Sequence, residues 1–306
     1  MKLGSNVLKG KSKYSSLEEA RDFVATCENK FEKRLDEIAD VVANDKKIKI
    51  VALSGPSCSG KTTTANKLIR ELESRGRRVH VVSIDDFYYD TEKLNQIAEE
   101  TGKLDYDSIR SIDFDALAEC VDEIFDKGKT TVPRFDFKKG RRVGYVEYSS
   151  LDEDVFIFEG IQAIYPEITE LLSRRHTISV CICVMSAIEI DGVVFEPNEI
   201  RFLRRVVRDY HFRNSPPEFT MELWDGVRSN EDVNIFPYID NVDLQIDSTL
   251  AFELSMLKPY ADDVLSKVSK ESEYYETSRK ILDKIKNIEP ISKDFISEHS
   301  LYNEFI

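Results

Sequence analysis

The sequence predicts an α/β protein in which helices cover both faces of a mainly parallel β-sheet. The first observation is that short apolar runs, typical of strands buried on both faces, alternate with longer stretches of helical periodicity. Such alternation favours parallel strands joined by crossover helices. The second observation is length, because 306 residues suffice for one large α/β domain with additions at its ends.

The first 45 residues predict a helical N-terminal extension. Residues 1–13 are basic and polar, and we expect them to be disordered. Ser16 to Glu19 fits a capping box, which marks the start of a helix. Apolar residues then recur at helical spacing from Leu17 to Val42, so one long helix or two short ones precede the main domain.

The main domain is expected at residues 46–262. Four apolar runs predict its buried strands: Ile48–Ser54, Val79–Ile84, Val155–Phe158 and Ile178–Met185. A last short strand is expected at Asp243–Ile246. Helical periodicity fills three stretches between and after these strands: Lys61–Arg75, Phe114–Phe125 and residues 198–229.

A hairpin and a second extension complete the predicted organisation. Two alternating runs, Thr131–Phe137 and Val143–Tyr148, predict a small hairpin around the basic loop Lys138–Arg142. Residues 263–306 predict a C-terminal helical extension, in which helices continue to about residue 288.

The composition excludes several classes of partner. A formal net charge of −14 and a pI of 4.9 mean that the average field repels nucleic acid and anionic membranes. No stretch approaches the ~18 apolar residues of a membrane-spanning helix, and the N-terminus lacks the apolar region of a secretory signal. The five cysteines form no CxxC pair, and Cys181 and Cys183 are expected on one core-facing side of a strand. We therefore expect a cytoplasmic enzyme without a metal site of the Cys/His type.

A glycine-rich loop is the strongest motif. Gly55 to Thr62 matches GxxxxGK[ST] at every fixed position, and the loop leaves an apolar strand and opens an amphipathic helix. Backbone N–H groups of such a loop, with the helix N-terminus, bind phosphate oxygens. Lys61 is then expected at the β and γ phosphates and the Thr62 hydroxyl on Mg²⁺. The predicted fold is therefore of the P-loop NTPase type, with ATP and Mg²⁺ as cofactors. The expected nucleotide-binding residues are Gly55, Ser57, Cys58, Ser59, Gly60, Lys61, Thr62 and Thr63.

Acidic residues follow two of the predicted strands. Asp85 and Asp86 end the second strand, and Glu159 ends the third. Ligands of open parallel sheets gather at the carboxyl ends of the strands. One acid there is expected to hold Mg²⁺ and the other to take a proton from an acceptor hydroxyl. For Asp86, capping of the following helix is an equally good interpretation.

Two clusters of basic residues are candidates for anion binding. Arg201, Arg204, Arg205 and Arg208 are spaced to share one helix face. In an acidic protein this face is expected to act as a lid over a triphosphate, although pairing with Glu196, Glu199 or Asp209 is the alternative. The loop Lys138–Arg142 is either part of an acceptor site or a plain hairpin tip.

These motifs, in this order, resemble the uridine kinase and phosphoribulokinase family, and most closely its bacterial uridine kinase-like branch. The resemblance covers Lys46 to Asp262 and rests on the P-loop and four further segments: Ile84–Tyr88, Pro133–Phe137, Phe158–Gly160 and Arg201–Asp209. It implies transfer of a phosphoryl group from ATP to the 5′-hydroxyl of a uridine- or cytidine-like nucleoside.

The resemblance also assigns roles to residues. Asp85 becomes the catalytic base, with Lys61, Arg205 and Arg208 as further catalytic residues and Glu159 beside Thr62 as a metal ligand. Residues implied to bind the nucleoside, besides Asp85, are Tyr88, Tyr106, Asp107, Phe135, Phe137 and Arg204. Two family positions differ in this acceptor region: Gly140 stands where a histidine is usual, and Ser108-Ile109 stands where His-Pro is usual.

Other functions stay open at this point. Within the kinases, the acceptor is alternatively a phosphorylated sugar or a pantothenate-like alcohol. A GTPase-like switch needs Asn-Lys-x-Asp and Asp-x-x-Gly strings, and neither occurs in the sequence. A nucleotide-binding module without catalysis is the remaining alternative. The sequence does not decide between ATP and GTP or fix the oligomeric state, a homo-oligomer included.

Overall fold

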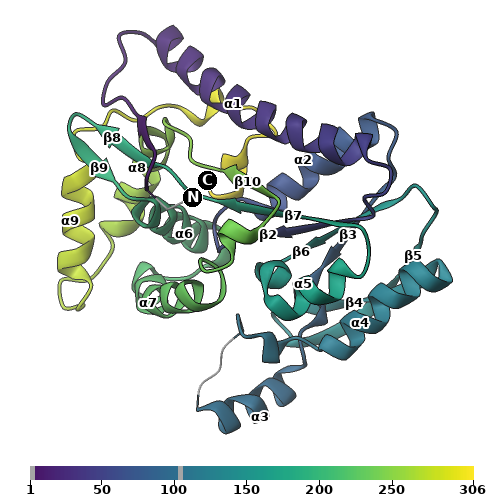
Figure 1. Ribbon diagram of the computed structural model, residues 1–306. Coiled ribbons are helices and arrows are strands. Elements are labelled where there is room, and N and C mark those ends of the chain that lie inside the picture. Colours follow the sequence, from purple (N-terminus) through teal and green to yellow (C-terminus); the bar gives the residue numbers. More distant parts are fainter. Residues whose placement is uncertain (1–3, 103–105) are drawn as a thin grey trace.

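Five parallel strands form the central sheet of the protein. The computed structural model describes residues 4–102 and 106–306 (Figure 1). The strand order is β10-β7-β2-β6-β3, and every neighbouring pair is parallel. The bounds of these strands are Ile50–Ser54 for β2, Val79–Ser83 for β3, Val155–Glu159 for β6, Thr177–Cys183 for β7 and Leu244–Asp247 for β10. The predicted fold class is confirmed, and each predicted strand lies within about two residues of an observed one.

Helices cover both faces of this sheet (Figure 1). On one face lie α1 (Leu17–Asn44) and α2 (Lys61–Ser74), and on the other lie α4 (Phe114–Asp122) and α5 (Pro166–Ser173). Alternate residues of the central strand β2 enter different core clusters. Val51 and Leu53 pack with α1 and α2, whereas Ile50 and Ala52 pack with α4 and α5. Burial on both faces is why the predicted strands read as continuous apolar runs.

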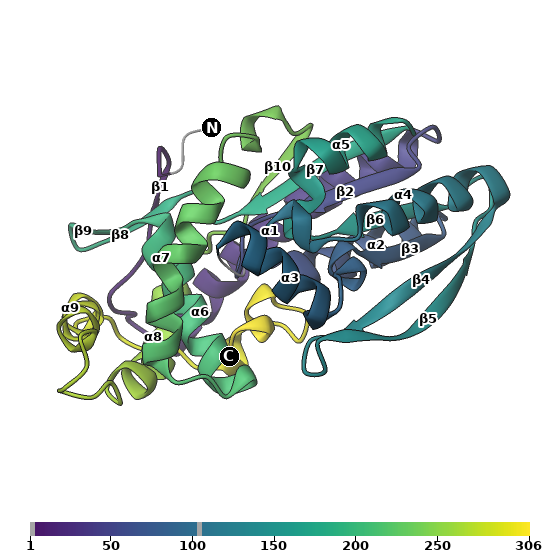
Figure 2. The same ribbon diagram turned by 90° about the horizontal axis from the view of Figure 1, so that it is seen from below.

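The remaining elements surround the sheet. A 3₁₀ turn at Ile84–Phe87 follows β3, and α4 continues as a π turn at Glu123–Lys127 before Gly128. The other helices are α3 (Thr91–Thr101), α6 (Pro197–Arg213), α7 (Pro217–Asn234), α8 (Glu253–Leu265) and α9 (Tyr275–Ile285). The antiparallel hairpin of β4 (Lys129–Asp136) and β5 (Arg141–Ser149) confirms the predicted hairpin. Figure 2 shows it as a long arm beside the sheet.

The N-terminal segment is ordered through a partner far along the chain. Val7–Lys9 forms β1, which pairs in parallel with β8 (Ala187–Ile190); β8 also pairs with β9 (Val193–Phe195). The expectation of disorder is therefore wrong for this part of residues 1–13, while residues 1–3 lie outside the described residues. This strand has only three residues, too few for a periodic pattern, and its partner lies about 180 residues away.

Both expected extensions contribute to the core of the main domain. A single helix, α1, follows Ser16, whose side chain accepts a hydrogen bond from the Glu19 N–H. Its buried face packs in the same cluster as α2. At the other end, Tyr302 and Phe305 are fully buried in this cluster, close to a 3₁₀ turn at Leu301–Glu304. The domain end expected at residue 262 falls inside α8.

The burial of Phe305 leads to a stability prediction. Phe305→Ala removes a fully buried ring and should lower the free energy of unfolding by about 3–5 kcal/mol, measured by denaturant titration. Phe219→Ala is the matched control, because that ring on α7 is half exposed and should cost less than ~1 kcal/mol. A loss below ~1 kcal/mol for Phe305→Ala would mean that the C-terminal segment is not part of the core.

Candidate active site

The glycine-rich loop connects β2 to α2 in a tightly curled path. Gly60 is the residue before α2 and has a φ of +95°, a left-handed conformation that suits glycine. A Cβ atom on Gly55 would lie 2.1 Å from the carbonyl oxygen of Ile182, so only glycine fits there. The Lys61 ammonium folds back over the loop and donates to the carbonyl oxygens of Gly55 at 2.8 Å and Pro56 at 3.3 Å. A cationic loop at a helix N-terminus is the physical requirement for triphosphate binding.

The predicted strand-end acids lie together next to this loop. Strands β3 and β6 are neighbours, and Ser83 pairs in register with Glu159. The Ser83 hydroxyl donates a hydrogen bond of 2.8 Å to the Glu159 carboxylate. Asp85 sits in the 3₁₀ turn after β3, and its Oδ1 atom is shielded from solvent without a hydrogen-bond partner among the described residues.

Burial makes the carboxyl group of Asp85 an unusually weak acid. Desolvation raises the pKa of its carboxyl group to about 7, and the negative charge of Glu159 contributes to the same shift. The positive charge of Lys61 acts in the opposite direction on this pKa. A carboxyl group that exchanges a proton near neutral pH, beside a P-loop lysine, has the property required of a general base.

Asp86 binds the hairpin of β4 and β5. Its carboxylate pairs with Arg134 at 2.6 Å and accepts the backbone N–H of Phe135 at 2.9 Å. Asp86 thus holds β4 against the end of β3. The structure replaces the capping interpretation with this ion pair, which local sequence could not predict because Arg134 lies 48 residues away.

Four aromatic residues predicted to bind the acceptor form one group. The ring of Tyr88 lies 6.2 Å from that of Tyr106, 5.7 Å from that of Phe135 and 5.8 Å from that of Phe137. Tyr88 is buried, whereas Tyr106 and Phe137 are exposed. The group therefore offers flat apolar faces at the surface, and its member Tyr88 follows Asp85 by three residues.

Sequence reasoning missed two residues that hold this group. Gln162 donates a hydrogen bond of 3.0 Å to the Tyr88 hydroxyl, which itself donates to the Tyr106 carbonyl oxygen at 2.7 Å. The Tyr165 hydroxyl donates to the carbonyl oxygen of Asp107 at 2.8 Å. The charge of Asp107 also contributes to the raised pKa of Asp85, so Asp107 lies close to the site. Their position in the sequence could have indicated this role, because Gln162 and Tyr165 follow the predicted strand end Glu159-Gly160 by two and five residues.

Two arginines of the predicted lid are buried beneath the P-loop. Arg204 is fully buried and pairs with Glu253 of α8 at 2.7 Å, and Arg201 is fully buried and pairs with Glu231 of α7. The predicted acceptor contact of Arg204 is wrong, because this side chain has no access to solvent and its donors bind Glu253 and two backbone carbonyl oxygens. Its acidic partner lies 49 residues further along the chain and was not visible as a neighbour in the sequence.

The two arginines expected to act catalytically converge on one acid. Arg208 donates to the Asp209 carboxylate at 2.7 Å, and Arg205 lies 3.4 Å from the other oxygen of the same group. Pairing with Asp209, the alternative considered for this helix face, is thus present in the structure. A lid role for Arg205 and Arg208 stays a prediction.

A C-terminal turn covers the outside of the P-loop, which the sequence did not predict. A Cβ atom on Gly60 would lie 2.0 Å from the Leu301 side chain, so this turn touches the loop directly. The carboxylate of Glu304 accepts a hydrogen bond of 3.1 Å from the Thr63 hydroxyl. The rings of Tyr302 and Phe305 lie 5.5 Å and 5.1 Å from the Arg204 guanidinium.

The oxygen donors of the site fit a magnesium ion bound together with phosphate. Thr62 is exposed at the start of α2, Glu159 ends the neighbouring strand, and Asp85 Oδ1 lacks a partner within the described chain. In the described ranges, no group of three or more His, Cys, Asp or Glu side chains is arranged to hold a metal alone. The hydroxyl of Thr62 and the carboxylate of Glu159 fit Mg²⁺, which keeps several waters and binds through one or two protein oxygens plus substrate phosphates.

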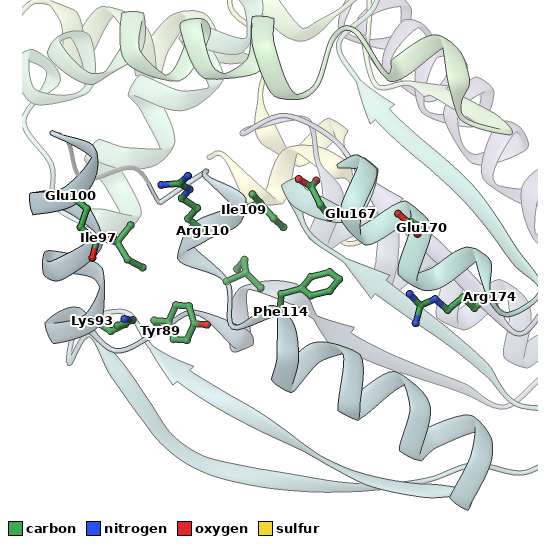
Figure 3. Close-up of a pocket in the computed structure, with 11 residues that line it drawn as sticks. Tyr89, Lys93, Ile97, Glu100, Ile109, Arg110, Phe114, Glu167, Glu170 and Arg174 are labelled. Carbon is green, nitrogen blue, oxygen red and sulfur yellow. The ribbon is translucent and has the colours of Figure 1, made fainter.

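A separate pocket is lined by Tyr89 and by residues of three helices. Its volume is about 620 Å³, and it opens between α3, α4 and α5 (Figure 3). Lys93 and Ile97 of α3 face Glu167 and Glu170 of α5 across it. Neither the P-loop nor the strand-end acids line this pocket.

Comparison with known proteins identifies the class. The sequence profile of the Phosphoribulokinase / Uridine kinase family matches residues 50–254, and the chain belongs to this family. The fold and the P-loop site are thus those of a small-molecule kinase, a phosphotransferase whose relatives use ATP and Mg²⁺. No helix in the described ranges combines the length and the apolar character needed to cross a bilayer.

Individual relatives agree with this class. Uridine-cytidine kinase C of Dictyostelium discoideum is 29% identical over 64% of this chain, and the match spans 38% of that protein. The uridine kinase of Ureaplasma urealyticum is 28% identical over 59% of this chain and 78% of its own length. A putative fructose transport system kinase from Silicibacter sp. TM1040 shares the fold, with a TM-score of 0.51 at 19% identity over 69% of this chain and 98% of its own.

The raised pKa of Asp85 leads to a pH-dependent stability prediction. Between pH 4 and 7 the folded protein holds a proton on Asp85 that the unfolded chain releases, so this group's contribution to stability falls as pH rises. Asp85→Asn removes the penalty of the buried charge and should raise the free energy of unfolding by roughly 2–4 kcal/mol at pH 8. The gain should vanish near pH 4.

Denaturant titrations of the variant and the parent at pH 4, 6 and 8 measure this effect. Asp86→Asn is the control, and it should lower the free energy of unfolding because it loses the ion pair with Arg134. A gain for Asp85→Asn that is equal at all three values of pH would exclude titration of Asp85 as its cause.

The contact between Glu304 and Thr63 leads to a prediction about nucleotide affinity. The Glu304 carboxylate places a negative charge at the N-terminus of α2, where a triphosphate adds its own. Glu304→Gln keeps a hydrogen-bond acceptor and removes the repulsion, so we expect the KM for ATP to fall about 2- to 10-fold with kcat unchanged.

Steady-state kinetics at two salt concentrations measure this change, which should shrink at high ionic strength. Glu298→Gln changes a largely exposed side chain six residues earlier and should leave the KM unaltered. A rise in KM for Glu304→Gln would show that the carboxylate assists nucleotide binding.

Proposed function

We propose that the chain transfers the γ-phosphoryl group of ATP to the 5′-hydroxyl of a nucleoside of the uridine or cytidine type. One observation carries the proposal: Asp85, a carboxyl group with a pKa near neutrality, lies between the phosphate loop and the aromatic group. A hydroxyl attached to a flat, stacked molecule would meet both the base and the phosphate at this point.

The phosphate side of the reaction uses the P-loop. Lys61 would leave the carbonyl oxygens of Gly55 and Pro56 for the β and γ phosphates, and the loop N–H groups would hold the remaining oxygens. Thr62 and Glu159 would hold Mg²⁺, which supplies charge neutralisation of the phosphates when bound. Arg205 and Arg208 would add positive charge as the site closes.

Asp85 would act on the acceptor hydroxyl. Above pH 7 it is ionised, and a proton from the attacking hydroxyl would pass to its carboxylate as the new P–O bond forms. Desolvation and repulsion from Glu159 keep this carboxylate basic, whereas the positive charge of Lys61 limits the rise in its pKa. The charge balance between these three groups therefore tunes the base.

The charges near the aromatic group favour a neutral acceptor over a phosphorylated sugar. Three of the cations close to it already have acidic partners: Arg134 pairs with Asp86, Lys139 with Asp136 and Arg142 with Asp113. A phosphorylated acceptor would have to compete with these acids. A nucleoside base needs only apolar ring faces, which Phe135 and the exposed Phe137 would offer against the buried Tyr88, and its ribose hydroxyls would be held by Asp107.

The experiment is a panel of acceptors assayed by ADP release and by detection of the phosphorylated product. We expect turnover with pyrimidine nucleosides and not with sugar phosphates or pantothenate. Lys61→Ala should reduce this turnover by at least ~10³-fold and Asp85→Asn by ~10²–10⁴-fold. The preferred turnover of a sugar phosphate would refute the proposed acceptor.

The matched control for Asp85→Asn is Asp154→Asn. Asp154 is also buried but lies before β6, at the opposite end of the strand from Glu159, where it contacts His80 at 2.8 Å. It should affect stability and leave kcat near the parent value. Near-normal turnover in a folded Asp85→Asn protein would remove Asp85 from the role of base.

A further inference from the structure

Two carbonyl oxygens of the P-loop are bound by buried arginines. Arg201 donates from Nε and Nη2 to the carbonyl oxygen of Ser57, at 3.2 Å and 3.1 Å. Arg204 donates from Nη1 to the carbonyl oxygen of Cys58 at 3.3 Å. Both side chains belong to α6 and have no exposed surface, so these contacts are not surface pairings that water can replace.

Peptide planarity turns these contacts into a constraint on the loop N–H groups. In a trans peptide the carbonyl oxygen of one residue and the N–H of the next point in opposite directions, and the chain has no cis peptide in its described part. Binding of the Ser57 oxygen by Arg201 therefore directs the Cys58 N–H away from α6. The peptide after Cys58 is held in the same way, and its Ser59 N–H closes a turn onto the Pro56 oxygen at 3.2 Å.

The loop needs such support because part of it is strained. Cys58 has a φ of +61°, in the left-handed region that costs a residue with a Cβ atom roughly 1–2 kcal/mol. Its carbonyl oxygen is the one bound by Arg204. Cys58 thus has a backbone conformation that glycine would adopt more easily. The buried guanidinium of Arg204 holds it in that conformation.

Each arginine is itself fixed by an acid and by rings. Arg201 pairs with Glu231 and lies 5.5 Å from the ring of Trp224. Arg204 pairs with Glu253 and also donates to the carbonyl oxygen of Ser248 at 2.7 Å. The rings of Tyr302 and Phe305 lie near its guanidinium, so the C-terminal turn contributes to its position. A guanidinium with five donors can bind an acid and a carbonyl oxygen at once, and an ammonium on a single nitrogen cannot reproduce this geometry.

We propose that Arg201 and Arg204 are positioning residues that orient the P-loop peptides for nucleotide binding. The inference rests on the proposed binding of nucleotide at the P-loop, but not on the identity of the acceptor. The two arginines would not touch phosphate. They would act through the Ser57 and Cys58 carbonyl oxygens, and loss of this contact would let the peptides rotate.

The test is equilibrium binding of MgATP and MgADP to Arg201→Lys and Arg204→Lys, measured by calorimetry well below the unfolding temperature. Lysine keeps the charge beside the glutamate but cannot bind the loop oxygen at the same time. We expect binding about 10- to 100-fold weaker, as for loss of one hydrogen bond to a charged group. In turnover assays the KM for ATP should rise while the KM for the acceptor stays at the parent value.

Arg77→Lys is the matched control for stability. Arg77 is also buried and donates to backbone oxygens, those of Val42 at 2.9 Å and Ile48 at 2.8 Å, but it precedes β3 at the end of the sheet opposite the P-loop. Arg77→Lys should lose about as much stability as Arg201→Lys and Arg204→Lys, and it should keep the parent affinity for MgATP. Parent affinity in folded Arg201→Lys and Arg204→Lys would overturn the proposal.

A second variant keeps the test decisive if the lysine proteins do not fold. Arg201→Met combined with Glu231→Met replaces a buried ion pair by apolar groups of similar volume, which is often neutral for stability. It removes the contact to Ser57, so weaker MgATP binding supports the proposal and parent affinity overturns it. A parent protein that binds MgATP but phosphorylates no nucleoside would refute the proposed acceptor alone, and the comparison of affinities would still decide this proposal.

Discussion

The buried ion pair between Arg204 and Glu253 is the interaction on which the rest of the site depends. It joins four segments that are far apart in the sequence: the P-loop, helix α6, the start of α8 and the C-terminal turn. Removing either charge would leave the other in a dry interior, which is strongly destabilising. The pair therefore makes the shape of the phosphate loop a property of the whole domain and not of the glycine-rich motif alone.

A second constraint acts at the strand ends, where stability and chemistry oppose each other. Asp85 is held in a position where its charge is unfavourable, and the neighbouring charge of Glu159 increases this cost. The same environment gives the carboxyl group a proton affinity suited to work near neutral pH. The charge of the next residue, Asp86, is favourable instead, because its ion pair with Arg134 stabilises the hairpin. The structural task thus falls to Asp86, and the chemical task is the one proposed for Asp85.

Local patterns in the sequence were sufficient for the fold and for much of the site. The apolar runs, the GxxxxGK[ST] string and the strand-end acids each depend on residues close together in the chain, and the predicted strands and P-loop follow from them. The sequence was insufficient where a partner lies far away. The role of Arg204 depends on Glu253, that of Asp86 on Arg134, and the order of Val7–Lys9 on β8. Helical spacing correctly grouped the arginines on one helix, but it could not show that α7 and α8 supply acids against two of them.

The hydrogen bond between Thr63 and Glu304 spans 241 positions of the chain, and this separation has a consequence for folding. Contacts between residues so distant in sequence form late, because the loop between them must be closed first. The strand and helix that flank the P-loop can form early from local signals. We expect the contacts of Leu301 with Gly60, and of Tyr302 and Phe305 with Arg204, to form later, because they join segments far apart in the chain. The protein would then acquire its nucleotide site at the end of folding, so that competence to bind nucleotide reports that the whole chain has reached its native topology.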